Sequence, residues 1–182
     1  MSLLIIYMMT SWLPILIKDT GLSLSQAARV SAMFQVGGTL GAILLGAAMD
    51  RFNPFRVLVC AYITGAFCLL LIGLFHDQFT LLTIGVFGMG FCISGSQVGA
   101  NALAASFYPT TMRSTGVSWA HGVGRIGSVI GTLGGGWMLG MGMGFNGIFT
   151  VLMLPALVAG TAIFVMGLCY SRSLAQPSIA VH

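Results

Sequence analysis

The sequence predicts an all-α membrane protein with six transmembrane helices. Of its 182 residues, 57% are hydrophobic and 5% are charged, a composition far from that of soluble domains. The mean hydropathy is +1.00. The apolar residues form several stretches of about 20 residues, the length that one membrane-spanning helix needs, and short polar breaks separate these stretches. A helical bundle is therefore expected.

The first three helices are expected at about 1–20, 24–49 and 57–75. Gly21 ends the first helix, because glycine readily takes the left-handed conformation that follows many helices. Residues Ser23 to Gln26 have the spacing of a capping box that opens the second helix. Pro14 predicts a bend in the first helix, near its outer end.

The last three helices are expected at about 79–107, 111–139 and 146–170. Pro109 separates the fourth helix from the fifth, because proline lacks the backbone N–H that a helix interior requires. We expect residues 1–182 to form a single transmembrane domain, in which 172–182 are a short cytoplasmic tail.

Basic residues predict the orientation. Six spans place both termini on one side, together with Arg51, Arg56, Arg113 and Arg172, whereas the breaks on the opposite side carry Lys18 and Arg29. Loops rich in lysine and arginine stay in the cytoplasm. Both termini are therefore expected to be cytoplasmic.

The second and fifth helices align with each other at an offset of 90 residues. Gln35 falls on Arg125, and three glycines of the second helix (Gly37, Gly41, Gly46) fall on Gly127, Gly131 and Gly136. This predicts two repeats of three helices, at about 1–75 and 79–171. Because each repeat has an odd number of spans, the two repeats would insert into the membrane in opposite directions. Inverted repeats are typical of secondary transporters, with the substrate site near mid-membrane. Chance similarity between two glycine-rich helices is the alternative.

Arg125 is the most informative residue in the chain. It lies about 18 Å along the fifth helix at 1.5 Å per residue, near the middle of the bilayer. At 100° per residue, the polar side chains of this helix, apart from Thr115 and the indoles, fall within an arc of about 80°; they are Ser114, Ser118, His121, Arg125, Ser128 and Thr132. Most glycines of the helix lie on the other side, where a neighbouring helix can approach closely.

A charge at this depth is costly and marks a functional site by default. The planar guanidinium matches a carboxylate with two hydrogen bonds, so we expect Arg125 to bind an organic anion. A structural ion pair is the alternative. Asp19, Asp50 and Asp77 all lie at span ends, so such a partner would come from outside this chain.

Further candidate site residues surround this stripe. His121 lies one turn from Arg125 and could carry protons or remain a neutral hydrogen-bonded side chain. Gln35, Gln97 and Asn101 are polar groups that need partners within a bundle. Trp12, Phe34 and Trp119 are candidates for an apolar slot that stacks a substrate ring, or they serve packing and interfacial anchoring.

Residues Leu44 to Leu58 resemble the loop signature of the major facilitator superfamily. Gly46, Asp50, Arg51 and Arg56 match it, and Asn53 replaces the customary turn glycine, a change that asparagine tolerates because it accepts left-handed geometry. Two further stretches, 11–42 and 108–131, resemble the C-terminal half of the aromatic acid:proton symporter branch.

This resemblance implies one half of a major facilitator fold. It implies import of aromatic carboxylates of the benzoate or hydroxybenzoate type, driven by protons across a bacterial inner membrane. It also assigns Asp50 and Arg51 to a cytoplasmic gate and makes Arg113 and Arg125 important for transport. An ion pair between Asp50 and Arg113 would hold one conformation. The expected partner is a missing six-helix N-terminal half or a second copy of the chain.

Other functions stay open at this point. The chain could serve a carrier for another organic anion or a sugar, or it could be a non-transporting fragment or subunit from an interrupted transporter gene. An enzyme is not expected, because no nucleophile with a base, metal-ligand cluster or phosphate loop is recognisable. We expect no cofactor, no metal and no nucleic-acid partner.

Overall fold

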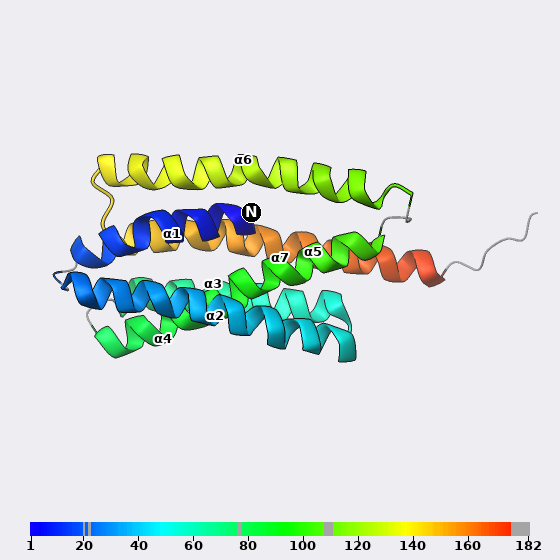
Figure 1. Ribbon diagram of the computed structural model, residues 1–182, viewed down its shortest axis with the longest axis horizontal. Coiled ribbons are helices and arrows are strands. Elements are labelled where there is room, and N and C mark those ends of the chain that lie inside the picture. Colours follow the sequence, from blue (N-terminus) through cyan, green and yellow to red (C-terminus); the bar gives the residue numbers. More distant parts are fainter. Residues whose placement is uncertain (20, 22, 76–77, 108–110, 176–182) are drawn as a thin grey trace, which may run out of the picture.

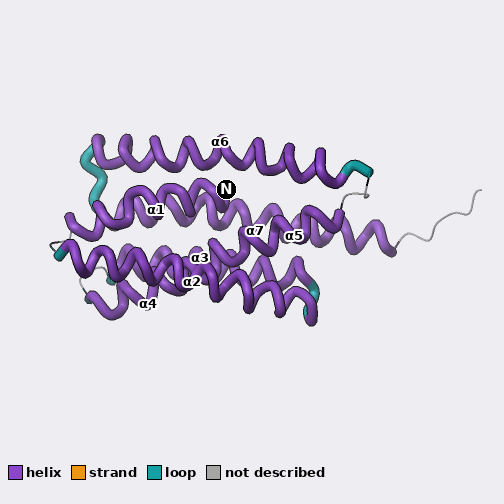
Figure 2. Tube along the Cα trace, viewed as in Figure 1, coloured by secondary structure: helices purple, strands orange, loops and turns teal. Residues whose placement is uncertain are grey.

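The computed structural model describes residues 1–19, 21, 23–75, 78–107 and 111–175. This part of the chain folds into six rods, all helical (Figure 2). The first three are α1 (Ser2–Asp19), α2 (Leu24–Arg51) and α3 (Pro54–Leu74). The fourth is continuous but consists of α4 (Phe79–Met89), a π-helical segment η1 (Gly90–Ser94) and α5 (Gly95–Phe107). The last two are α6 (Arg113–Gly140) and α7 (Phe145–Ala175).

The helix boundaries follow the local signals in most places. Gly21 has a φ of 86°, so it takes the left-handed conformation expected after α1. The capping box at Ser23 and Gln26 is formed in both directions. Pro14 is accommodated inside α1. Pro109 lies outside the described residues, and the expected tail begins within α7, which continues to Ala175.

The expectation for Asn53 is wrong. Its φ is −59°, so it does not take left-handed geometry. Instead, its side-chain oxygen accepts a hydrogen bond from the backbone N–H of Phe55 at 3.0 Å. This cap, with Pro54 in the first turn, lets α3 begin three residues before the expected Val57, because proline is already set for the first helical position.

The helices pack in a specific pairing. α3 lies along α7, α1 lies along α6, and α2 lies along the fourth rod, with α1 between α2 and α6 (Figure 1). One buried cluster joins α1, α2, α3, α4 and α7, and its largest side chains include Phe149, Met8, Met9, Leu69 and Leu82. α6 contributes to this cluster only through partly buried side chains near its end, such as Met138 and Leu139.

Glycines permit the closest helix crossings. A Cβ added to Gly41 of α2 would collide with the carbonyl oxygen of Phe91, and one added to Gly131 of α6 would collide with that of Leu4. A Cβ on Gly95 would lie 2.6 Å from the carbonyl carbon of Gly41. Small residues at such crossings bring the backbones into van der Waals contact, which drives helix association in lipid.

The π-helical segment was not foreseen from the sequence. It interrupts the fourth rod where α2 crosses it, and a Cβ on Gly90 would collide with the carbonyl oxygen of Phe34. Such segments are single-turn insertions that recur at functional sites. The residues beyond it, including Gln97 and Asn101, therefore point in directions that an uninterrupted α-helix would not give them.

Four of the rods are long and apolar enough to cross a membrane: α2, α3, the fourth rod over 79–106, and α7. The apolar part of α1 spans 17 residues (Ser2–Lys18) and is shorter. α6 has 28 residues but does not reach the same hydropathy, since it carries the polar stripe and many glycines. The chain is thus an integral membrane protein. We propose that α1 and α6 also cross the membrane, which would make six spans.

Candidate functional site

The polar stripe of α6 lies largely on its exposed side. Ser114, Ser118, His121 and Arg125 are all exposed. Further along, the hydroxyl of Ser128 donates to the carbonyl oxygen of Arg125 at 2.7 Å, and that of Thr132 donates to the carbonyl oxygen of Ser128 at 3.0 Å. The two hydroxyls are thus bonded back to the helix, and the charged end of the stripe points away from the bundle.

The opposite side of α6 packs on α1, as the glycine pattern predicts. Side chains of α1 would collide with a Cβ on Gly124 and on Gly135. Gly134, in contrast, has no atom within 4 Å of its Cβ position, so it does not belong to this contact. α6 therefore presents one glycine face to α1 and one polar face outward.

The Arg125 side chain has no hydrogen bond or ion pair within the described part of the chain. The same holds for His121, one turn earlier. A guanidinium carries five N–H donors, and those of Arg125 are not engaged by Asp50 or by any other described side chain. The arrangement can hold an anion, because a planar cation and an imidazole project from neighbouring turns of one helix.

The three aromatic candidates lie in different environments. Phe34 is 2% exposed and belongs to the core. Trp12 donates its indole N–H to the carbonyl oxygen of Thr132 at 2.8 Å and packs against Gly135. Trp119 is 72% exposed on α6. Among the described residues these three rings do not stack on one another, and Trp119 is the one with a free ring face.

Gln97 and Asn101 are the two site candidates that the structure joins directly. The Gln97 amide donates to the side-chain oxygen of Asn101 at 3.3 Å on α5, and both are half-buried. The spacing of four residues puts the two amides on one face of the helix. Each amide keeps further donors and acceptors, so the pair can still bind a polar ligand group.

Gln35 lines a cavity of about 250 Å³ between α1 and α2. Its other lining residues are Met9, Thr10, Leu13, Ser31, Ala32 and Phe34. The Thr10 and Ser31 hydroxyls donate to the carbonyl oxygens of Ile6 and Ala27 within their own helices. The Gln35 amide has no partner in the described residues, so it is the polar group that the cavity offers to a ligand.

Thr10 and Ser31 are residues that the sequence analysis did not single out. Both are hydroxyl side chains within otherwise apolar segments, and that contrast was the signal available. Tyr7 is a further polar residue of α1 that was not singled out. It is 48% exposed and lies one turn before Ser11, which is also exposed. The outer face of α1 is therefore more polar than its composition suggested.

The residues of the loop signature gather at one end of the bundle. α2 ends there with Asp50 and Arg51, α3 begins there with Arg56 in its first turn, and α6 begins there with Arg113 (Figure 1). Gly46 lies one turn before Asp50 and has no atom within 4 Å of its Cβ position. Asp50 has no ion pair among the described residues, so the expected pair with Arg113 is not formed in this structure.

The sequence profile of the Major Facilitator Superfamily matches residues 1–178. The chain belongs to the major facilitator superfamily. Members of this superfamily are transporters and not enzymes, which confirms that expectation. Among the described residues, no three His, Cys, Asp or Glu side chains form a group that could hold a metal ion.

Several curated members of the superfamily are similar to this chain. The gallate transporter of Pseudomonas putida is 45% identical over 98% of the chain. The 4-hydroxybenzoate transporter PcaK of Pseudomonas aeruginosa is 46% identical over 92%, and the 3-(3-hydroxy-phenyl)propionate transporter of Escherichia coli is 38% identical over 97%. The chain spans 39%, 38% and 43% of the lengths of these relatives. No solved structure matches it.

Proposed function

We propose that this superfamily member forms the C-terminal half of a secondary transporter that imports an aromatic carboxylate together with protons. The substrate would be of the benzoate or hydroxybenzoate type. Gallate and 4-hydroxybenzoate, which name two of the relatives, are both aromatic acids. The protein would reside in a bacterial inner membrane with both termini in the cytoplasm, since Arg51, Arg56 and Arg113 lie at the same end of the bundle.

The observation that carries this proposal is the unpartnered guanidinium of Arg125 on the outward face of α6. A cation at this depth is stable when it meets water or an anion. A benzoate-type substrate presents a planar carboxylate, which accepts two parallel hydrogen bonds from a guanidinium. Trp119 lies six residues earlier with a free ring face, and it is a candidate to stack the substrate ring.

Proton coupling is assigned to His121. Its imidazole is exposed one turn from Arg125, and an imidazole can both accept and donate a proton. A carboxylate held by Arg125 would lie beside this imidazole, so substrate and proton would enter the site together.

The pairing of helices supports an inverted repeat. If the two repeats exchange places, α1 replaces the fourth rod, α2 replaces α6, and α3 replaces α7. The pair of α1 and α6 then becomes the pair of the fourth rod and α2, and the pair of α3 and α7 stays the same. Gly41 and Gly131, which align at the offset of 90, both cross the first helix of the opposite repeat at a carbonyl oxygen. By the same alignment, Gln35 and Arg125 occupy equivalent places, both exposed.

The transport pathway would need a second half. α6 exposes large apolar side chains along its length, among them Val123, Ile126, Ile130, Leu133 and Trp137, and α2 exposes Val36, Leu40, Ile43 and Leu44. These faces flank the polar groups Gln35 and Arg125. A six-helix N-terminal half covering α1, α2 and α6 would enclose those polar groups between the halves; a second copy of this chain is the alternative occupant.

The test is substrate binding by the full-length protein, with Arg125→Lys and Arg125→Gln compared with Arg29→Gln. Calorimetry with 4-hydroxybenzoate should show a loss of affinity of about tenfold or more for both Arg125 variants, because lysine lacks the planar fork. Arg29→Gln, a loss of charge at the other end of the bundle, should bind normally. Unchanged affinity in Arg125→Gln would reject the proposed role.

A competition experiment identifies the substrate class. Uptake of labelled 4-hydroxybenzoate into proteoliposomes should be reduced by benzoate and gallate and not by glucose or by succinate. Gln35→Ala should weaken uptake of hydroxylated acids more than that of benzoate, because the Gln35 amide can hydrogen-bond a ring hydroxyl. Competition by succinate would indicate a carrier for another organic anion, and competition by glucose would indicate a sugar carrier; either result would reject the aromatic-acid proposal.

A further inference from the structure

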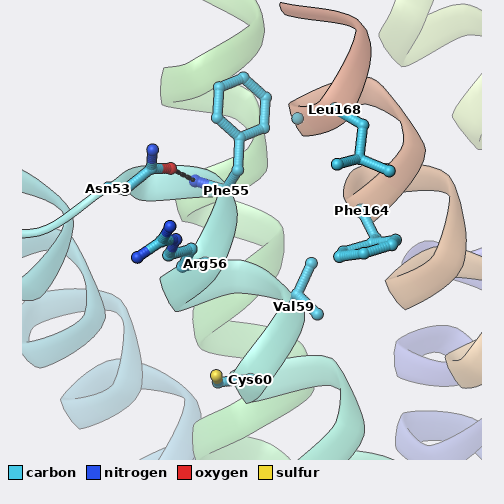
Figure 3. A pocket seen from close by; sticks show the side chains of 8 residues that line it. Asn53, Phe55, Arg56, Val59, Cys60, Phe164 and Leu168 are labelled. Carbon is cyan, nitrogen blue, oxygen red and sulfur yellow. Dashed lines mark hydrogen bonds between the residues drawn. The ribbon is translucent and has the colours of Figure 1, made fainter. Parts of the chain in front are cut away.

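A groove separate from the proposed transport site runs between α3 and α7. Its volume is about 360 Å³, and it lies at the end of the bundle where α3 begins and α7 ends (Figure 3). Its lining residues are Asn53, Phe55, Arg56, Val59, Cys60, Phe164, Gly167 and Leu168. A Cβ on Gly167 would lie 3.0 Å from the Cβ of Phe55, so the absence of that side chain lets the two helices close the floor of the groove.

The groove is polar at its outer end and apolar further in. Asn53 and Arg56 lie close together at one side, and Val59 points toward Phe164 on the other (Figure 3). Cys60 lies one turn deeper than Arg56, about 6 Å along the helix axis. Phe164 is 53% exposed and Leu168 is 46% exposed, so α7 offers an accessible apolar wall.

The polar end carries an unengaged positive charge. Arg56 is exposed and has no hydrogen bond or ion pair to any described residue. The Asn53 oxygen is held by the backbone N–H of Phe55, which turns the amide nitrogen away from the helix and leaves it able to donate. A guanidinium and an amide N–H₂ therefore stand together where an apolar groove opens at the end of the bundle.

We propose that this groove binds one anionic phospholipid, with its phosphate on Arg56 and Asn53 and an acyl chain along Val59, Cys60 and Phe164. The two ends of the groove match the two ends of such a lipid in charge and polarity. Arg56 lies at the end of a membrane-spanning helix, which is the depth of the headgroups. Basic pockets between helices at the cytoplasmic side are suited to anionic headgroups.

This site does not depend on the proposed transport activity. It lies on α3 and α7, whereas the candidate substrate-binding residues lie on α1, α2, α5 and α6; Arg56 is the residue that the groove shares with the loop signature. Only the insertion of these two helices into a membrane is required, and both are long and apolar enough for that. Its failure would therefore leave the aromatic-acid proposal intact, and the reverse is also true.

The test uses the full-length protein purified in detergent and incubated with an equal mixture of dioleoyl phosphatidylglycerol and dioleoyl phosphatidylethanolamine. Native mass spectrometry should show preferential retention of phosphatidylglycerol. Arg56→Gln should reduce that retention about fivefold, the effect of one basic residue at a membrane surface. Arg29→Gln, at the opposite end of the bundle, is the matched control and should retain the lipid.

A second pair of variants tests the apolar part of the groove without removing charge. Cys60→Trp should fill the groove and reduce retention, whereas Cys60→Ala should not. Glycerol 1-phosphate, a headgroup without chains, should fail to displace the lipid. The proposal is overturned by equal retention of the two lipids, by unchanged retention in both Arg56→Gln and Cys60→Trp, or by displacement with glycerol 1-phosphate, which would indicate a simple anion site.

Discussion

Trp12 of α1 donates its indole N–H to the carbonyl oxygen of Thr132 in α6 at 2.8 Å, and its ring covers Gly135 one turn further along. This contact joins the two helices at Thr132. There the hydroxyls of the polar stripe donate to carbonyl oxygens of α6 itself. We call this packing of α1 on α6 the α1–α6 joint. Since α6 contacts the rest of the bundle mainly through α1, the position of Arg125 depends on the α1–α6 joint.

Gly131→Ala should weaken the α1–α6 joint, because the added methyl collides with the backbone of Leu4. Backbone cannot rotate away as a flexible side chain can, so we expect a loss of about 1–3 kcal/mol of stability. Gly134→Ala is the matched control on the same helix, because its Cβ would meet no atom within 4 Å. Thermal denaturation in detergent, followed by size-exclusion chromatography, compares the two. Equal stability would contradict the close crossing.

Tyr62→Phe should destabilise the bundle by about 1 kcal/mol. The Tyr62 and Ser2 hydroxyls share a buried hydrogen bond of 2.5 Å that joins α3 to α1, and the variant leaves the Ser2 hydroxyl without this partner. Tyr7→Phe removes a hydroxyl from an exposed ring and should be neutral. The same denaturation assay separates them, and a neutral Tyr62→Phe would show that the bond contributes nothing.

Asn53→Ala should cost about 1 kcal/mol, the usual loss when a helix N-cap is removed. Asn53→Gly should cost only a few tenths, since glycine is tolerated at this position. Because the φ of Asn53 is −59°, glycine gains no advantage from its left-handed freedom here. If Asn53→Gly proved more stable than the parent, the capping interpretation would be wrong.

Ser96→Ala should leave stability unchanged or raise it slightly. Ser96 is fully buried in α5, and its hydroxyl oxygen has no partner among the described residues. A buried hydroxyl without a hydrogen bond is costly, and its removal is therefore neutral or favourable. Ser96→Val, which adds volume at a closely packed position, serves as the contrasting variant and should destabilise. A clear loss of stability in Ser96→Ala would reveal a bond that this conformation lacks.

The sequence by itself determined the membrane class, the six helices and most of their ends. Apolar runs of bilayer length, Gly21 and the Ser23 capping box are local signals, and local backbone preferences were enough to read them. The sequence also identified the polar face of α6, because a period of 3.6 residues places Ser118, His121 and Arg125 together whatever surrounds them.

Only the tertiary structure decided what those faces meet. It placed Phe34 in the core and Trp119 outside, although both are single aromatics in apolar helices, because burial depends on which neighbour packs there. It inserted the π-helical segment at the crossing of α2, joined Trp12 to Thr132 and opened the grooves beside Gln35 and Arg56. These features come from contacts between residues far apart in the chain, and no local pattern encodes the distance between two helices.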